Sequence, residues 1–206
     1  MQRILKIVFF IVLITIGTRL YHSRPWASSL VLTGVALEEK NGSLSGSIVL
    51  NHVLKINGIL VSFINEKPVI EFPKSSYQNN SRNRLFINQN IKEEVLQSIT
   101  NKEIEIDTIR GVNFSVRDLA IVRSDKGELV TCKVIFNDSL EVICFVKSRI
   151  EPARILWPRI RRPQGWIDIL EIKDKGIKEE LDREIYQKYR LLMNEKSLNK
   201  GAESET

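Results

Sequence analysis

The stretch LVTCKVIFNDSLEVICFVK, residues 129–147, decides the fold class, because it has the pattern of two strands joined by a tight turn. Apolar and polar side chains alternate on either side of Asn137-Asp138-Ser139, as they do along strands that bury one face. A three-residue turn at this point would place Cys132 directly opposite Cys144. We therefore expect an antiparallel hairpin whose buried face carries both cysteines.

A second stretch of the same kind, residues 32–63, aligns with residues 117–148 and indicates an internal duplication. The spacing between matching positions stays at 85 or 86 residues, since 127 minus 42 is 85 and 137 minus 51 is 86. The four matches are Asn41-Gly42 with Lys126-Gly127, Leu50-Asn51 with Phe136-Asn137, Phe72-Pro73-Lys74 with Trp157-Pro158-Arg159, and 91–95 with 177–181. Matches in one order at one spacing predict two copies of one unit.

Each copy is expected to contain three or four strands followed by a helix. In the first copy Asn90 has the position of an N-cap, because Glu93 follows three residues later as in a capping box. Apolar side chains at helical spacing line one face of each helix: Ile91, Val95 and Ile99 in the first, and Ile177, Leu181, Ile185, Tyr189 and Leu192 in the second. The prediction is an α+β fold of two tandem small antiparallel β-sheet domains, 29–107 and 112–195, each followed by a helix.

Both ends of the chain are expected to lie outside these domains. Residues 1–24 contain an apolar run, Ile7 to Gly17, that only Thr15 interrupts. Counted from Ile4 the segment has 14 residues, which as a helix measure about 21 Å against a roughly 30 Å hydrocarbon core. This length favours a signal peptide, whereas the absence of a clear small-x-small cleavage site favours an uncleaved N-terminal hydrophobic helix that anchors the protein in a membrane. Residues 197–206 have too little apolar content to fold and are expected to be a disordered tail.

The residue inventory argues against catalysis. The chain has only two histidines, His22 and His52, and it lacks nucleotide-binding and zinc-binding motifs, so we expect neither an enzyme nor a cofactor or metal. Cys132 and Cys144 are expected to be two free core thiols or a cross-strand disulfide, and the disulfide would require an oxidising compartment. An excess of 31 Lys and Arg over 25 Asp and Glu, a net charge of +6, mildly favours anionic partners.

The segments GSIVLNHVLKINGILVSF, EFPKSS and FINQNIKEEVLQSI resemble the bacterial SpoVG septation-regulator family. Leu50-Asn51-His52 stands at the place of that family's Leu-Asp-His turn, and Pro73-Lys74-Ser75 at the place of its Pro-Ser-Lys loop. The likeness covers 30–99 and is more diffuse in the second copy. It implies a small sheet with a helix against it, dimerisation, and a nucleic-acid-binding regulator linked to septation, cell division and sporulation. A tandem copy then implies a pseudo-dimer within one chain.

The resemblance also implies where nucleic acid would bind. Lys74 and, by position and charge, Arg159, Arg161 and Arg162 are expected to contact the phosphates of DNA or RNA. Trp166, which follows the three arginines, offers a surface on which a base can stack.

Two classes of function follow from these features. The first is a membrane-anchored nucleic-acid-binding regulator, for which the family resemblance favours the cytoplasmic side of the membrane. The alternative is an extracytoplasmic structural or protein-interaction module of the cell envelope, which self-associates or binds a partner through its sheet edges. In that alternative the arginines make a loop soluble or meet anionic lipid.

Overall fold

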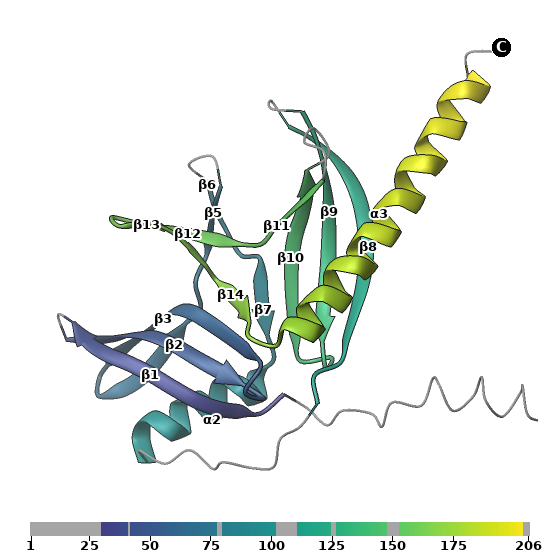
Figure 1. Ribbon diagram of the computed structural model, residues 1–206. Helices are drawn as coiled ribbons and strands as arrows, with labels where there is room; N and C mark the ends of the chain where they lie inside the picture. Colours follow the sequence, from purple (N-terminus) through teal and green to yellow (C-terminus); the bar gives the residue numbers. More distant parts are fainter. Residues whose placement is uncertain are drawn as a thin grey trace, which may run out of the picture.

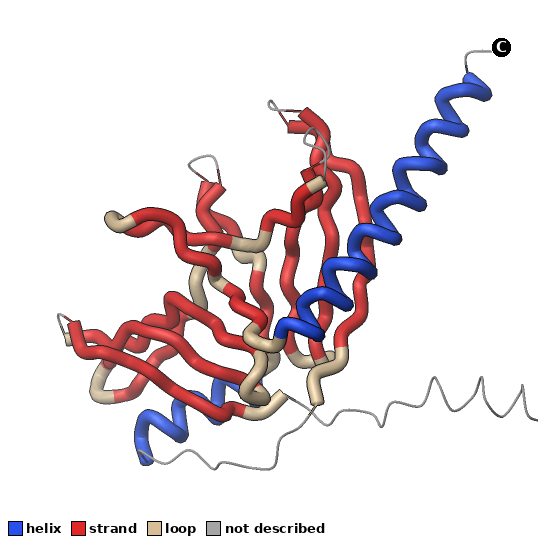
Figure 2. The backbone as a smooth tube through the Cα atoms, viewed as in Figure 1, coloured by secondary structure: helices blue, strands red, loops and turns tan. Residues whose placement is uncertain are grey.

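The computed structural model describes residues 30–40, 42–77, 80–101, 111–124, 127–147 and 153–203. These residues form a mixed α+β fold of antiparallel sheets and two helices, which confirms the expected fold class (Figures 1 and 2). The first half contains β1 (Leu32–Lys40), β2 (Ser43–Leu50), β3 (Leu54–Ile64), β4 (Lys67–Glu71), β5 (Ser75–Tyr77), β6 (Asn80–Arg82), β7 (Leu85–Ile87) and α2 (Gln89–Asn101). The second half contains β8 (Phe114–Ser124), β9 (Gly127–Phe136), β10 (Leu140–Lys147), β11 (Arg154–Leu156), β12 (Arg159–Arg162), β13 (Gly165–Asp168), β14 (Leu170–Ile172) and α3 (Lys175–Glu203).

Two five-stranded sheets exchange one short strand each. The first sheet has the order β1-β2-β3-β14, with β4 also paired to β3, and the second has the order β11-β10-β9-β8, with β7 also paired to β10. Thus β7 leaves the first half to pair with the second sheet, and β14 makes the reciprocal move. Two backbone hydrogen bonds show the same reciprocal relation between the halves. Ile143 N donates to Arg84 O, next to β7, and Asn57 N donates to Ile169 O, next to β14, both at 2.8 Å. This exchange was not foreseen from the sequence.

The hairpin expected around residue 138 is confirmed. β9 and β10 pair from Phe136↔Leu140 outward, and this register places Cys132 directly opposite Cys144. The alternating apolar side chains of both strands are buried, as the period of two predicts: Val130, Cys132, Val134, Phe136, Leu140, Val142, Cys144 and Val146. Together with Ile48, Leu50, Leu54 and Ile56 of the first sheet they belong to one continuous hydrophobic core.

The helices cover different sheets. α2 packs on β1 and β4, and α3 packs on β8 and contacts β14 (Figure 1). The predicted stripes are buried where each helix meets its sheet, at Ile91 and Val95 in α2 and at Leu181 and Ile185 in α3.

Two expectations about helix ends were wrong. Asn90 is not the N-cap, because α2 already begins at Gln89 and the Asn88 side chain accepts the hydrogen bond from Ile91 N at 3.1 Å. The tail expected to be disordered from residue 197 is helical to Glu203. Propagation of an established helix through good helix formers such as Lys, Ala and Glu accounts for this extension, although few of these residues are apolar.

The proposed anchor, residues 1–24, lies outside the described residues, as do Asn41 and Lys126 of the expected turns. Of the two helices that the structure does describe, neither combines the length and the apolar composition needed to cross a membrane.

Candidate nucleic-acid interface

Four of the five residues expected to bind nucleic acid lie on one exposed hairpin, β12–β13. Its register pairs Arg159 with Asp168, Arg161 with Trp166, and Arg162 with Gly165. Residues that lie opposite each other in an antiparallel ladder share a face, and neighbours along a strand alternate. Arg159, Arg161 and Trp166 are therefore on one face of the hairpin, and Trp166 is 54% exposed.

Arg162 belongs to the opposite face of the same hairpin, with Ile160. That face is directed at the first sheet: a Cβ built on Gly58 of β3 would lie 2.7 Å from Ile160 Cδ1 and 3.7 Å from Arg162 Nη2. The hairpin thus does not present its three arginines as a single cluster. Arg159 and Arg161 share the Trp166 face, and Arg162 accompanies the buried Ile160.

A glycine bulge allows this close approach. Between the pairs Gly46↔Ile59 and Ser47↔Asn57, Gly58 is an extra residue in β3, and its φ of 84° is readily adopted only without a Cβ. The neighbouring Asn57 extends the attachment, because its Nδ2 donates to Asp168 O at 3.0 Å. The hairpin is consequently fixed to the first sheet through both its strands.

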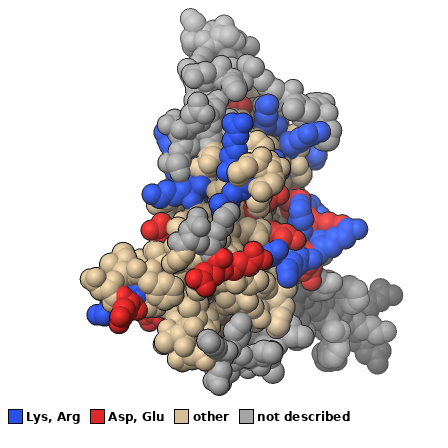
Figure 3. All heavy atoms as spheres, turned by 90° about the vertical axis from the view of Figure 1, so that its left-hand side faces the viewer, with Lys and Arg blue, Asp and Glu red and all other residues tan. Residues whose placement is uncertain are grey.

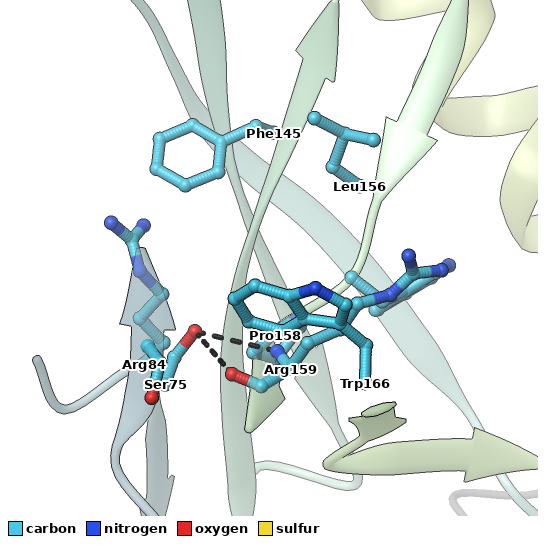
Figure 4. Close-up of a pocket in the computed structure, with 9 residues that line it drawn as sticks. Ser75, Arg84, Phe145, Leu156, Pro158, Arg159 and Trp166 are labelled. Atoms are coloured by element: carbon cyan, nitrogen blue, oxygen red, sulfur yellow. Dashed lines mark hydrogen bonds between the residues drawn. The ribbon is translucent and has the colours of Figure 1, made fainter. Parts of the chain in front are cut away.

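The fifth predicted residue, Lys74, lies near the hairpin because the next residue, Ser75, is hydrogen-bonded to Arg159. The buried Ser75 Oγ donates to Arg159 O at 3.3 Å and accepts from Arg159 N at 3.4 Å (Figure 4). Ser75 therefore joins the loop of the first half to β12 of the second. Lys74 itself is exposed beside this junction.

An ion pair orients the Arg159 side chain. Its Nε donates to Asp168 Oδ1 at 2.5 Å, and both side chains are about half exposed. An exposed pair of this kind contributes little to stability, but it fixes the direction of a guanidinium whose terminal nitrogens are separate donors. Arg161 is the next residue of β12 on the same face as Arg159, and it is exposed opposite Trp166.

A pocket of about 200 Å³ opens beside this hairpin, between the two halves of the chain. Its walls are mainly apolar and aromatic, with Ser75, Ser76, Arg84 and Arg159 as the polar contributors; the apolar ones are Phe145, Leu156, Trp157, Pro158 and Trp166. Figure 4 shows Phe145 and Leu156 on one side and Trp166 with Pro158 on the other. The guanidinium carbon of Arg84 lies 4.1 Å from the centroid of the Phe145 ring, within the range of a cation–π contact.

Charge is unevenly distributed over the surface around these elements. Figure 3 shows Lys and Arg as most of the charged residues over the upper part of one face, with Asp and Glu gathered across its middle. Arg84 of the first half and Arg159 of the second line the pocket. Three more basic residues adjoin its lining residues: Lys74 precedes Ser75, Arg82 pairs with Ser75, and Arg161 pairs with Trp166. A basic surface of this kind favours anionic partners over cationic ones.

Cys132 and Cys144 lie apart from this surface, free and buried in the second sheet. A hydrogen bond with the Cys132 thiol, reinforced by burial, raises the pKa of the Cys144 thiol far above its ordinary value. Neither cysteine is part of a metal-binding group, because no cluster of His, Cys, Asp and Glu suited to a metal occurs within the described ranges. The disulfide alternative and the absence of catalysis stay predictions.

Several residues of the interface escaped the sequence analysis. In the sequence Ser75 belongs to the Pro-Lys-Ser loop, and neither Arg84 nor Phe145 belongs to a motif that indicates binding. The 85-residue spacing did pair Phe72-Pro73-Lys74 with Trp157-Pro158-Arg159, and the two matched segments are the ones that Ser75 and Arg159 join. Equivalence in a repeat gave no sign that the equivalent segments touch.

No protein-family model, curated protein or solved structure matches the chain.

Proposed function

We propose that this protein is a non-enzymatic, membrane-anchored regulator that binds nucleic acid through the Trp166 face of the β12–β13 hairpin. The observation that carries the proposal is the direct pairing of Arg161 with Trp166 on an exposed strand pair, next to Arg159. Arginine binds phosphate and an exposed indole stacks on a base, so the combination suits a single strand.

The proposal includes a tandem duplication of a SpoVG-like unit, arranged as a pseudo-dimer. Support comes from the equal order of elements in both halves and from the reciprocal placement of β7 and β14. On this proposal, one chain that contains both copies has the role in septation and development that the family resemblance implies.

A salt titration tests nucleic-acid binding. The full-length protein in mild detergent should bind a labelled single-stranded oligonucleotide, with log K falling linearly against log salt between roughly 50 and 200 mM. Arg161→Ala should weaken binding and reduce that slope by about 0.7, the value for one phosphate contact on a single strand. Lys175→Ala is the matched control, because it removes one charge from an 89% exposed side chain at the start of α3. Equal effects of the two variants, or no binding at the lowest salt, would contradict the proposal.

A cytoplasmic location of the folded part is a necessary element of this function. Protease added to intact cells should leave residues from 30 onward uncut, whereas protease added to lysed cells should cut them. Digestion in intact cells would place the folded part outside and rule out a nucleic-acid role in the cell.

A protein-interaction module is the second candidate, and the β3–β4 hairpin favours it. Phe63 and Ile64 are 50% and 58% exposed at the tip of this hairpin, and Val69 is 38% exposed on β4. Adjacent exposed apolar side chains are a common mark of a protein contact. Phe63→Ser and Ile64→Ser should abolish self-association or partner binding in this case and leave oligonucleotide binding unchanged.

A further inference from the structure

We infer that the pocket between Phe145 and Trp166 holds one unpaired nucleobase of a bound single strand, a site that deepens and rests on the proposed function. The pocket lies at the junction of the two halves, so neither half could form it alone. Ser75 and Arg84 enter from the first half, and Phe145, Leu156, Pro158 and Trp166 from the second (Figure 4).

The walls have the chemistry of a base-binding slot. Apolar groups lie on opposite sides, Phe145 with Leu156 on one and Trp166 with Pro158 on the other, so each side carries one aromatic ring (Figure 4). A nucleobase gains from contact with such surfaces whatever its identity, because every base has a π face. Ser76 and Arg84 also line the pocket, and the Arg84 guanidinium lies over the Phe145 ring, so we expect the base to stack chiefly on Trp166 and its polar edge to meet these two side chains.

The size of the pocket selects one ring system. At about 200 Å³ it lies below the roughly 300 to 1,000 Å³ of pockets that enclose drug-sized ligands. A single base fits this size better than a complete dinucleotide. The sugar and phosphate of the same nucleotide would then lie outside, over the exposed hairpin face that carries Arg161.

The charges around the opening favour a base over the aromatic side chain of a protein partner. Both arginines that line the pocket, Arg84 and Arg159, are cationic, and Lys74 precedes the lining residue Ser75. Arg159 is paired with Asp168 through its Nε, which leaves its terminal nitrogens available as separate donors. A strand with a phosphate on each side of the base complements this rim, whereas a neutral aromatic side chain uses only the walls.

The pocket is also held in shape before any ligand arrives. The two Ser75–Arg159 hydrogen bonds fix one wall, and Ile169 N donates to Pro158 O at 2.8 Å to fix the strand beyond it. A preformed slot avoids the ordering cost that a flexible surface incurs on binding.

Two oligonucleotides of equal charge separate this inference from general nucleic-acid binding. The first probe is a labelled oligothymidylate, and the second is a strand of the same length in which every base is replaced by an abasic site. The full-length protein should bind the thymidylate about 5- to 150-fold more tightly, the range for stacking of one base. Trp166→Ala should remove most of that preference, Trp166→Phe should retain part of it, and Arg161→Ala should weaken both probes alike.

Each outcome of this comparison is informative. Equal affinity of the two probes for the unaltered protein would overturn the base pocket while leaving phosphate binding, and with it the proposed function, intact. Binding of neither probe at low salt would overturn both. Trp166-dependent binding of a neutral acetylated tryptophan peptide, without a preference between the two strands, would assign the pocket to a protein side chain instead. Because Trp166 is largely exposed, its variants should unfold at the temperature of the unaltered protein, which a thermal melt checks.

Discussion

Asn51 and Asn137 donate their side-chain amides to the same carbonyl, Gly111 O, at 3.3 and 3.2 Å. Each also forms a reciprocal pair with a backbone segment of its own half: Asn51 with Val31, at 2.7 and 3.0 Å, and Asn137 with Asn113, at 2.8 and 3.1 Å. The matched asparagines of the two repeats thus make the same three bonds and meet at one peptide group. This shared carbonyl ties together the turns that precede β3 and β10.

Asn51→Ala should lower the free energy of unfolding by about 1–3 kcal/mol, because it leaves Val31 N and Gly111 O without this partner at a site where Asn51 is only 1% exposed. Chemical denaturation measures the loss. Asn65→Ala is the matched control, since Asn65 has a φ of 49° close to the 48° of Asn51 but lies exposed in a turn. Similar losses in both variants would mean that backbone strain, and not the buried amide, accounts for the effect.

Gly58→Ala should destabilise the protein by about 1–3 kcal/mol beyond the cost of its positive φ, because the new methyl group would overlap Ile160 Cδ1 at 2.7 Å and press on Pro73 Cβ at 3.3 Å. The comparison is with Gly42→Ala, where φ is 74° and no atom lies within 4 Å of the added Cβ. Equal unfolding midpoints for the two variants would show that β12 does not pack on β3 as described. The Gly58 variant should also weaken oligonucleotide binding.

Ser75→Ala should reduce stability by about 0.5–1.5 kcal/mol, the usual net value of a hydrogen bond, and should loosen β12. Faster amide exchange at Arg159, measured by hydrogen–deuterium exchange, is the specific sign of this loss. Ser76→Ala provides the control, because its hydroxyl makes no hydrogen bond to the described residues. Unchanged exchange at Arg159 in the Ser75 variant would contradict the proposed link between the halves.

The thiol pair predicts how stability changes with alkaline pH. With the pKa of Cys144 raised, the folded protein retains a thiol proton that unfolded thiols release above roughly pH 8.5. The same hydrogen bond lowers the pKa of the Cys132 thiol, so at alkaline pH the folded pair retains one shared proton where the two unfolded thiols retain none. The stability that comes from this proton is lost as the pH rises above that value, by up to about 1.4 kcal/mol per pH unit. Under reducing conditions, the stability difference between the unaltered protein and the Cys132→Val, Cys144→Val double variant should therefore shrink from pH 8 to pH 10. A constant difference would refute the prediction.

Local patterns were sufficient to predict much of the fold. The length of the turn at Asn137-Asp138-Ser139 placed Cys132 opposite Cys144. Alternation identified the buried faces of β9 and β10, because a period of two is set within a single strand. The buried faces of the helices, which contain Ile91 and Leu181, could be predicted in the same way, because the 3.6-residue period of apolar side chains is also set within one helix.

Contacts between the halves could not be predicted in this way. β7 and β14 have three residues each, too few for a pattern to indicate which sheet they join. The pocket depends on that pairing, since Arg84 immediately precedes β7 and meets Phe145 of β10. The arginines were expected in a loop, whereas all three lie on strand β12. The division that puts Arg161 with Trp166 and Arg162 with Ile160 required the register of a hairpin that was not foreseen.

Photocrosslinking tests the central claim most directly. The full-length protein is irradiated with a single-stranded oligonucleotide that carries 4-thiothymidine, and the crosslinked peptides are identified by mass spectrometry. Crosslinks should fall within residues 156–168, with Trp166 as the main position, and should be competed by unlabelled single strands. Crosslinks confined to α3, or a crosslinking pattern unchanged by Trp166→Ala, would contradict the account.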